Sequence, residues 1–405
     1  MFTLKGSRAS ALVTIDEIDE STRSQIATFL DSPAFAGSRI AIMPDCHAGK
    51  GAVIGLTMTT NDFVVPNIVG VDIGCGMLAR RLAPEAAARF EPAAFDGFVR
   101  RTVPAGFEVN REVRSEVERE LLERIDEEAS RSGADRRRAA LALGSLGGGN
   151  HFIEIDRDPE GGLWLVVHTG SRNFGKCVAE HYQARARAYC AGLRGAKIPR
   201  DLEYLPMEHR GARAYLAAMR LAQDYAARNR ALVADRLLDF LGGPDERGPD
   251  ERGPDGTAAR GIDAGGMGAL PASIESVHNY IDFEDLVVRK GAIPARAGQL
   301  CFIPFNMRDG SAICRGRGNP EYNRSAPHGA GRVMSRHQAR RELSVERFRS
   351  SLREAGVYTS TAVEGTLDEA PEAYKSAALI LGHLGPTVEV EALLRPVYNF
   401  KASGE

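Results

Sequence analysis

The sequence of 405 residues predicts a mixed α+β protein in which helices surround layered sheets. Short apolar runs rich in β-branched residues indicate strands, and longer segments with an apolar residue every three or four positions indicate helices. The two kinds of segment interleave irregularly. A doubly wound parallel sheet or an eightfold barrel would need a steady alternation of strand and helix, so neither of those folds is expected.

Four apolar runs are predicted to form strands. They lie at residues 38–45 (SRIAIMPD), 67–74 (NIVGVDIG), 163–168 (LWLVVH) and 299–305 (QLCFIPF). Gly, Pro and Asp bound the first two runs, as is usual for strands. Polar residues with functional chemistry follow these runs directly, which places candidate site residues at strand ends.

Two segments have the pattern of helices. Residues 108–131 are highly charged and carry an apolar residue at every fourth position, which is typical of an exposed amphipathic helix. Those apolar positions are Val113, Val117, Leu121 and Ile125. Residues 211–242 are predicted to form a long helix because their apolar residues keep one face and glycines stand at both ends.

The composition is that of a globular protein, with 43% hydrophobic and 26% charged residues and a net charge of −2. A strongly basic surface is therefore excluded, and any nucleic acid must be held by a local basic patch. The N-terminal residues are acidic where a signal peptide would be apolar, and no apolar stretch reaches 18 residues. We expect a cytoplasmic location, no membrane partner and reduced cysteines.

Glycine is unevenly distributed along the chain. Sixteen of the 43 glycines lie in four windows, residues 43–77, 144–154, 168–176 and 315–332, which also hold most of the candidate site residues. Another group lies in residues 242–268, where GPDER is repeated in tandem. This repeat of turn formers and charges cannot bury a core, so residues 242–268 are predicted to be a flexible surface insert without a catalytic part.

Familiar nucleotide and hydrolase signatures are absent from the sequence. It contains no P-loop, no G-x-G-x-x-G, no H-E-x-x-H, no G-x-S-x-G and no C-x-x-C. Instead, five residues with metal-binding side chains stand at or near the ends of apolar runs: Asp72, Cys75, His151, His168 and His278. A carboxylate, a thiolate and three imidazoles suit Mn, Fe, Co or Zn better than Ca or Mg alone. Each histidine alone is more often structural, but the set predicts a metal site.

A second cluster, Asp45, Cys46 and His47, offers further ligands or a Cys/His nucleophile pair. Adjacent residues of a strand point to opposite faces, so Cys46 and His47 are not expected to act together.

Residues 325–336 (SAPHGAGRVMSR) combine an imidazole, bare backbone amides and a guanidinium, which together suit a phosphate. The alternative is a helix N-cap turn with a solvated arginine. Arg315, Arg317 and Arg324 lie just upstream of Arg332 and predict a local cationic patch for a nucleotide or an RNA backbone. The alternative is an exposed loop kept soluble by charge.

Nine motifs, in order, resemble those of the RtcB family of RNA ligases. They read PDCHAGKGAVIG, VGVDIGCGM, GGGNHFIE, HTGSR, HNY, RGRGNPE, HGAGR with MSR, EAPEAYK, and LRP with Lys401, and they extend from about residue 39 to 401. The resemblance implies one α+β domain over residues 1–405 with a central metal-lined cleft, and a monomer. It also implies a GTP- and Mn(II)-dependent enzyme that joins RNA 2′,3′-cyclic phosphate or 3′-phosphate ends to 5′-hydroxyl ends, in tRNA splicing or RNA repair.

The resemblance also implies residue roles. Cys75 would bridge two manganese ions, Asp72 and His151 would complete one shell, and His168 and His278 the other. His328 would be the guanylylated nucleophile, Asp45 would orient it, and Arg172 would act near the metals and RNA. The residues expected to hold the guanylate are Asn150, Glu154, Asn306, Ser311, Gly329, Ala330, Gly331, Arg332, Tyr374 and Lys401.

The chain departs from the family pattern at a few positions. Asn306 replaces a guanylate-contacting serine, and Ala326 and Pro327 precede His328 where polar residues are common. Two other functions remain open: a metal-dependent RNA-end phosphatase or cyclic phosphodiesterase that has lost ligation, and a non-catalytic RNA-binding protein. Neither would need the nucleophilic His328, its carboxylate partner and a guanylate pocket, so the sequence favours the ligase.

Overall fold

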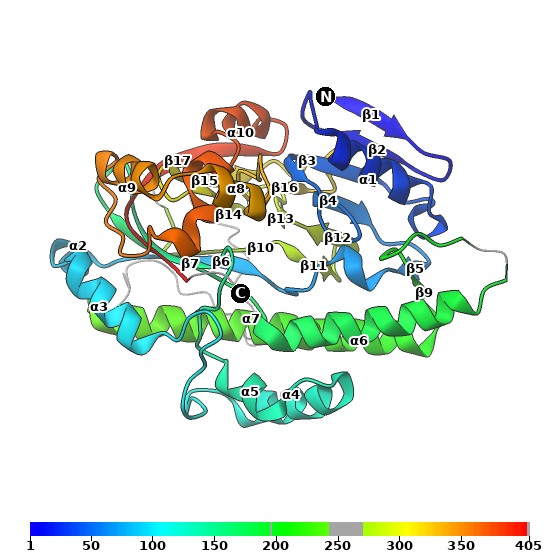
Figure 1. Ribbon diagram of the computed structural model, residues 1–405, viewed down its shortest axis with the longest axis horizontal. Helices are drawn as coiled ribbons and strands as arrows, with labels where there is room; N and C mark the ends of the chain where they lie inside the picture. The colour runs from blue at the N-terminus through cyan, green and yellow to red at the C-terminus, as the bar shows by residue number, and fades with distance from the viewer. Residues whose placement is uncertain (195–196, 243–269, 403–405) are drawn as a thin grey trace.

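A computed structural model describes residues 1–194, 197–242 and 270–402, and it confirms the mixed α+β fold (Figure 1). One sheet has six strands in the order β1-β2-β3-β4-β12-β11, and another has seven in the order β10-β6-β8-β7-β17-β15-β14. Two small sheets, β13-β16 and β5-β9, complete the strand pairing among the described residues.

The bounds of the six-stranded sheet are β1 (Phe2–Lys5), β2 (Ser10–Val13), β3 (Ile40–His47), β4 (Ile54–Thr59), β12 (Val287–Lys290) and β11 (Asn279–Asp282). Those of the seven-stranded sheet are β10 (Ser273–Val277), β6 (Gly76–Arg81), β8 (Leu163–Thr169), β7 (Phe152–Arg157), β17 (Val388–Lys401), β15 (Gly310–Gly316) and β14 (Leu300–Asn306). The small sheets join β13 (Ala292–Pro294) to β16 (Ser325–Pro327) and β5 (Phe63–Val64) to β9 (Leu205–Pro206).

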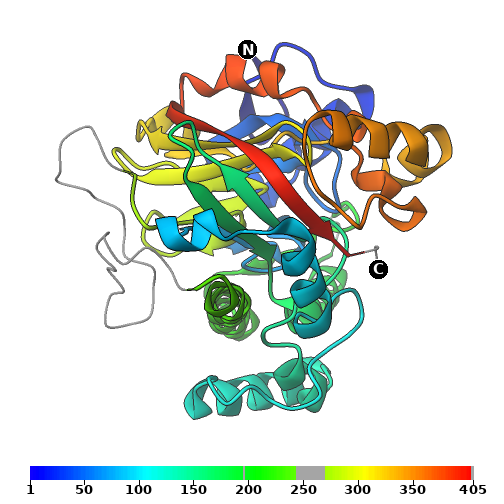
Figure 2. The ribbon, with the colours of Figure 1, turned by 90° about the vertical axis from the view of Figure 1, so that its left-hand side faces the viewer.

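Two long helices, α6 (Arg172–Ala191) and α7 (Arg210–Leu241), lie along one side of the sheets. Figure 2 shows α7 end-on beneath the strands, with α4 (Arg119–Ser132) and α5 (Arg136–Leu141) farther out. The other helices are α1 (Glu20–Leu30), α2 (Pro84–Ala88), α3 (Pro92–Thr102), α8 (Arg336–Glu342), α9 (Val345–Glu354) and α10 (Ala377–Leu384).

Apolar burial fixes this arrangement. The largest core cluster joins the six-stranded sheet to α1, α6 and α7, and a second joins the seven-stranded sheet to α3 and the end of α7. All seven residues of β8 are buried, as its continuous apolar run requires. Trp164 of β8 is fully buried and its indole N–H donates to Asp158 at 3.0 Å, so its polar atom is satisfied.

Three of the four predicted strands are confirmed as β3, β8 and β14, and the long helix is confirmed as α7. The predicted strand at residues 67–74 is wrong. Pro66–Ile68 form a 3-10 turn, and Gly70 and Gly74 adopt φ of 95° and 72°, which an extended strand does not accommodate. The next strand, β6, begins only at Gly76.

The predicted helix at residues 108–131 is correct only from Arg119 onward, where α4 begins. Residues 108–118 form turns and bends instead, because hydrogen bonds hold Asn110 at the end of α5. Its side-chain amide donates to the carbonyls of Leu141 at 3.1 Å and Leu143 at 2.8 Å. The predicted insert at 242–268 lies outside the described residues except for Gly242, the C-cap of α7. Among the described helices, none is long and apolar enough to cross a membrane.

Candidate active site

Three of the five predicted metal ligands meet where three neighbouring strands of the seven-stranded sheet begin or end. Cys75 precedes β6, His151 precedes β7, and His168 lies near the end of β8. β8 pairs with both β6 and β7, and His168 stands opposite Met77 and Phe152 in the register. Strand pairing therefore joins side chains that are distant in the sequence.

The two other predicted ligands come from a turn and from a crossover between sheets. Asp72 lies on the glycine-containing turn before β6. His278 lies between β10 of the seven-stranded sheet and β11 of the six-stranded sheet. Its backbone N–H donates to the carbonyl of Cys75 at 2.9 Å. His278 is thereby held at the same strand end as Cys75.

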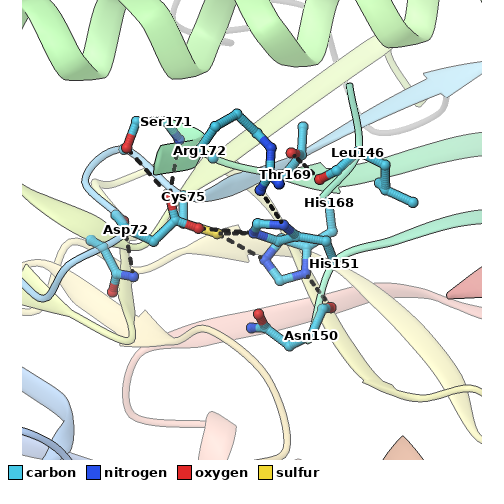
Figure 3. A network of polar contacts seen from close by, with 12 residues as sticks. Asp72, Cys75, Leu146, Asn150, His151, His168, Thr169, Ser171 and Arg172 are labelled. Atoms are coloured by element: carbon cyan, nitrogen blue, oxygen red, sulfur yellow. Dashed lines mark hydrogen bonds and ion pairs between the residues drawn. The ribbon is translucent and has the colours of Figure 1, made fainter. Parts of the chain in front are cut away.

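The five side chains form one compact cluster, most of which is visible in Figure 3. The Sγ of Cys75 lies 3.4 Å from Nε2 of His151 and 3.3 Å from Nε2 of His168. Asp72 Oδ2 lies 2.9 Å from Nε2 of His151, and Nε2 of His168 lies 3.4 Å from Nε2 of His278. Two groups of ligand atoms, each within 4.8 Å, share Cys75: one with Asp72 and His151, the other with His168 and His278.

Burial controls the protonation of the cluster. It raises the pKa of the Cys75 thiol and lowers the pKa values of His168 and His278, so both imidazoles are neutral at pH 7. Burial also opposes ionisation of Asp72, but the hydrogen bond from His151 and the charge of the Arg172 guanidinium outweigh it and lower the pKa of Asp72 to about 2. Neutral imidazoles and a carboxylate are the forms that bind a divalent ion.

Hydrogen bonds from outside the cluster orient two imidazoles. Nδ1 of His168 donates to the carbonyl of Asn150 at 3.0 Å, which leaves the Nε2 lone pair facing the cluster. His151 differs, because its Nδ1 accepts from Arg172 at 3.2 Å and its Nε2 donates to Asp72. An ion bound at Nε2 of His151 would displace that proton.

Arg172, the first residue of α6, has a left-handed backbone with φ of 57°, which residues other than glycine rarely adopt. Its guanidinium lies against Gly147, where a Cβ would be 1.8 Å from Nη1. Nη2 also donates to the carbonyl of Gly106 at 3.4 Å. This close fit holds the strained residue in place beside the cluster.

His328 and Asp45 form a pair next to the cluster. Oδ2 of Asp45 accepts from Nδ1 of His328 at 2.6 Å and from its backbone N–H at 3.1 Å. Asp45, in β3, has no exposed side-chain surface, whereas 18% of the His328 side chain is exposed. The ring centroids of His328 and His278 lie 4.8 Å apart. The pair and the cluster therefore belong to one site.

The loop that follows His328 packs closely on neighbouring backbone. Ala330 is buried. Gly331 has φ of 72°, and its carbonyl accepts from the backbone N–H of Lys375 at 3.0 Å. A Cβ on Gly329 would lie 3.1 Å from the carbonyl oxygen of Pro304. The small residues of this motif are thus required by contact as well as by backbone conformation.

Three predicted guanylate residues converge on Glu369, whose role the sequence analysis missed. Oε2 of Glu369 lies 2.9 Å from Nζ of Lys401 and accepts from the Tyr374 hydroxyl. Oε1 lies 3.4 Å from Nη1 of Arg332 and 2.7 Å from Nη1 of Arg336. Burial opposes ionisation of Glu369, but Lys401, Arg336 and Arg332 outweigh it and lower its pKa to about 2. Glu369 is the first residue of the EAPEAYK motif, and its place in that motif is the sequence feature that could have identified it.

Two further predicted guanylate residues are buried on the seven-stranded sheet. Glu154 of β7 accepts from the side-chain amide of Asn399, and Ser311 of β15 donates to Asp156 at 2.8 Å. Burial and then the repulsion of Asp156 raise the pKa of Glu154.

Asn306 is placed differently, because its side chain closes the hairpin between β14 and β15. Its Oδ1 accepts from the backbone N–H groups of Arg308 at 3.0 Å and Asp309 at 2.9 Å. Its Nδ2 donates to Oδ2 of Asp309 at 2.8 Å. A guanylate contact at Asn306 would have to replace these turn bonds.

The Cys46/His47 alternative is disfavoured by the protonation of both groups. Burial raises the pKa of the Cys46 thiol to about 12 and lowers the pKa of His47 to about 4. At pH 7 the thiol is therefore protonated and the imidazole is neutral. An activated thiolate would need nearby positive charge that lowers the pKa of the thiol.

The arginines of the predicted patch are paired with carboxylates. Arg315 pairs with Glu391 at 2.6 Å and Arg317 with Glu389 at 3.7 Å, both on β17. Arg324 pairs with Asp285 at 3.4 Å. The carboxylates balance these charges, which the arginine spacing alone could not reveal.

Arg230 of α7 supports the site and was also missed. Its side chain is 1% exposed, and Nη1 donates to the carbonyls of Gly74 at 2.6 Å and Thr169 at 3.1 Å. Each of these residues adjoins a member of the cluster. Glu275 of β10 accepts from Nε at 2.9 Å and from Nη2 at 2.7 Å. This buried ion pair joins the helix to the strand ends of the site.

The fold and this site define a mixed α+β enzyme built around a buried cluster of a cysteine, three imidazoles and a carboxylate, with a paired histidine beside it. A sequence profile described as "tRNA-splicing ligase RtcB" matches residues 25–402. The "RNA-splicing ligase RtcB" of Escherichia coli K12 is 32% identical over 409 residues, which cover 95% of each chain.

Other relatives extend the match. The "RNA-splicing ligase RtcB" of Mycobacterium tuberculosis H37Rv is 33% identical, covering 82% of this chain and 89% of that protein. The "tRNA-splicing ligase RtcB" of Aeropyrum pernix is 28% identical, covering 88% and 86%. The chain belongs to the RtcB family of RNA ligases.

Proposed function

We propose that this RNA ligase uses GTP and Mn(II) to join an RNA 2′,3′-cyclic phosphate or 3′-phosphate end to a 5′-hydroxyl end, through a guanylylated His328. The observation that carries the proposal is the His328–Asp45 pair with its ring 4.8 Å from that of His278, a member of the ligand cluster. We place this activity in tRNA splicing or RNA repair, in the cytoplasm, and expect a monomer.

The donor set fits two manganese ions. Asp72 and His151 would hold one ion, His168 and His278 the other, and Cys75 would bridge them. When bound, the ions would neutralise charge that develops on the reacting phosphates. The Nδ1 bond of His168 to Asn150 supports this assignment because it directs Nε2 toward the cluster.

Asp45 would prepare His328 for attack. Because Nδ1 of His328 donates to Asp45, its Nε2 carries the lone pair. Nε2 would attack the α-phosphorus of GTP, forming a P–N bond as the bond to pyrophosphate breaks. The positive charge that develops on the imidazole would be balanced by the buried carboxylate of Asp45. The 18% exposure of the His328 side chain leaves room for this approach.

The residues around Glu369 would hold the guanylate. The cations of Lys401, Arg332 and Arg336 surround Glu369, which keeps them in place before the nucleotide binds. Glu154 would accept hydrogen bonds from guanine N–H groups, which adenine does not offer at the same positions. This assignment predicts a preference for GTP over ATP.

RNA would complete the cycle in two displacements. An oxygen of the RNA 3′-phosphate attacks the guanylyl phosphorus and breaks the P–N bond, which frees His328. The 5′-hydroxyl of the second strand then attacks the activated 3′-phosphate, and GMP leaves. A 2′,3′-cyclic phosphate must first be opened by water. An ion bound at Nε2 of His151 leaves the imidazole proton on Nδ1, so Nδ1 can no longer accept a hydrogen bond from Arg172. The guanidinium of Arg172 would then turn toward these phosphates.

Labelled GTP tests this function directly. The protein with Mn(II) is expected to form an acid-labile, alkali-stable guanylyl adduct that His328→Ala abolishes. Arg317→Ala serves as a matched control, because Arg317 is half exposed and pairs only with Glu389 in the described structure. Failure of the wild-type protein to form an adduct, or an adduct on the His328→Ala protein, would show that the proposed mechanism is wrong.

A further inference from the structure

A cleft of about 450 Å³ opens onto the ligand cluster. Its lining includes Asp72, His151 and Arg172, together with the backbone of Gly148 and Gly149. The residues around Glu369 do not line it. Of the residues expected to hold the guanylate, only Asn150 lines the cleft, so the cleft opens onto the ligand cluster apart from the residues around Glu369.

An exposed aromatic ring lies in this cleft. Phe107 is 68% exposed, the largest fraction among the large exposed hydrophobic residues of the described chain. A phenyl ring left in water is unfavourable by about 25 cal/mol for each Å² of its surface. Its position beside cations and backbone amides is typical of a platform on which a nucleobase stacks.

The loop that carries Phe107 is held firmly at both ends. The carbonyl of Pro104 accepts from the Leu146 N–H at 2.8 Å, and Ala105 bridges to Gly147. At the other end, the backbone N–H of Asn110 donates to Leu141 at 3.0 Å. The carbonyl of Phe107 itself accepts from Arg138 at 2.5 Å. Phe107 is thus presented by an ordered loop, so a base that stacks on it would not have to order the loop first.

The charges of the cleft favour an anion. Arg138, Arg172 and Lys176 line it, against the carboxylates of Asp72 and Glu108. Asp72 is also one of the proposed ligands, so a bound ion would offset its charge. Lys176 is exposed on the second turn of α6, on the same helix as Arg172. The cleft is therefore cationic in a protein whose net charge is −2.

We infer that this cleft binds the single-stranded RNA end that carries the 3′-phosphate, with its terminal base stacked on Phe107 and its phosphates held by Arg138 and Lys176. This inference rests on the proposed function for the identity of the strand. A terminal phosphate monoester is nearly dianionic at pH 7, whereas a 5′-hydroxyl end is uncharged. The concentration of cations beside the cluster therefore favours the phosphate-bearing end.

The test uses binding without GTP, so no strand can be sealed. The probe is an eight-nucleotide RNA with a 3′-phosphate and 2-aminopurine as its last base, titrated with wild-type protein and Mn(II). Stacking on Phe107 is expected to quench the 2-aminopurine. Phe107→Ala is expected to remove the quenching and to weaken binding about tenfold, and Phe107→Trp to preserve both.

Charge is tested by a matched pair on α6. Lys176→Gln is expected to weaken binding of the 3′-phosphate strand and to reduce the salt dependence of log K by about 0.7. Arg185→Gln, an exposed position farther along the same helix, is expected to change neither quantity. A strand that ends in a 3′-hydroxyl is expected to bind more weakly than the 3′-phosphate strand.

Two outcomes overturn the inference. Equal binding and quenching by the wild-type and Phe107→Ala proteins would show that no base stacks on Phe107. Quenching of a 5′-terminal 2-aminopurine instead would assign the cleft to the other strand. Thermal unfolding of each variant, expected to match wild type because both side chains are exposed, verifies the fold. Guanylylation of the wild-type protein without RNA tests the proposed function separately, so either hypothesis can fail alone.

Discussion

At the scale of single residues, the glycines near the site are fixed by close approach. Gly331 has φ of 72°, and a Cβ there would lie 1.9 Å from the carbonyl oxygen of Asp45. A Cβ on Gly170 would lie 2.2 Å from Oδ1 of Asp72. The glycine-rich windows hold most of the candidate site residues, and these contacts give the physical reason.

Gly331→Ala is therefore expected to displace Asp45 and to reduce formation of the guanylyl adduct at least tenfold. The matched control is Gly382→Ala in α10, where the added methyl would meet no atom within 4 Å. Alanine there should stabilise the helix by about 0.5 to 1 kcal/mol. Adduct formation and thermal unfolding of both variants provide the measurement. Normal adduct formation in Gly331→Ala would show that the close approach of Gly331 to Asp45 does not position the His328–Asp45 pair.

Lys290 gives a pH dependence that can be measured. It is buried, and Nζ donates to the carbonyls of Lys50 and Asn67. Burial, followed by the charge of Lys50, lowers its pKa from 10.5 to about 7. Above pH 7 the unfolded chain holds more protons at this residue than the folded protein does. The free energy of unfolding should therefore rise as the pH increases from 7, and this contribution is lost as the pH falls toward 7.

Comparison with Lys290→Met isolates this effect. Between pH 7 and 8.5 the wild-type free energy of unfolding should gain about 1 to 2 kcal/mol relative to that of the variant. Denaturant titrations at several pH values give the two curves. Parallel curves would show that the pKa of Lys290 is not lowered.

At the scale of elements, the ion pair between α7 and β10 positions two strand ends. Arg230→Met would leave Glu275 without its partner and the carbonyls of Gly74 and Thr169 without their donor. We expect a loss of about 3 to 5 kcal/mol in the free energy of unfolding, because one partner of a buried pair is removed. We also expect weaker Mn(II) binding, because the adjacent ligands lose their backbone support.

The neighbouring Arg228 provides the control for this prediction. Arg228 is on the same helix as Arg230, pairs with the exposed Glu118 of the α4 N-cap at 3.1 Å and donates to the carbonyl of Glu116. Arg228→Met should cost less than about 1 kcal/mol and leave Mn(II) affinity unchanged. A second variant, Arg230→Met with Glu275→Met, should recover stability without recovering Mn(II) affinity. Recovery of both would mean that Arg230 has only a structural role.

At the scale of the whole molecule, the ligand cluster joins the two large sheets. Three of the proposed ligands stand at strand ends of the seven-stranded sheet, and His278 lies where the chain crosses to the six-stranded sheet. An ion bound there would link both sheets, so unfolding either would release it. Ligand binding to the folded state alone stabilises it by about 2.7 kcal/mol at a hundred times the dissociation constant.

Mn(II) is accordingly expected to raise the melting temperature of the wild-type protein, and Cys75→Ala should remove that rise. Mg(II) should have a smaller effect, because thiolate and imidazole donors disfavour it. Differential scanning calorimetry with a metal-free sample as reference measures each rise. An equal Mn(II) effect in Cys75→Ala would place the stabilising ion elsewhere.

The sequence by itself determined three of the four predicted strands, the long helix α7 and all five members of the ligand cluster. β8 and α7 follow from patterns that are strong over their whole length. The motifs containing Cys75, His151 and His328 determined the family and predicted the site. Local patterns failed at residues 67–74 and 108–118, where glycine backbone conformation and the bonds of Asn110 to the end of α5 override apolar spacing.

Only the tertiary structure decided which residues support and surround that site. Arg230, Glu369 and Phe107 acquire their roles from partners that are far away in the sequence or from exposure in the folded protein. It also decided that the charges of the arginine patch are balanced, because the carboxylates of β17 pair with Arg315 and Arg317. Spacing along a chain constrains local conformation, whereas burial, charge pairing and solvent access depend on packing between distant segments.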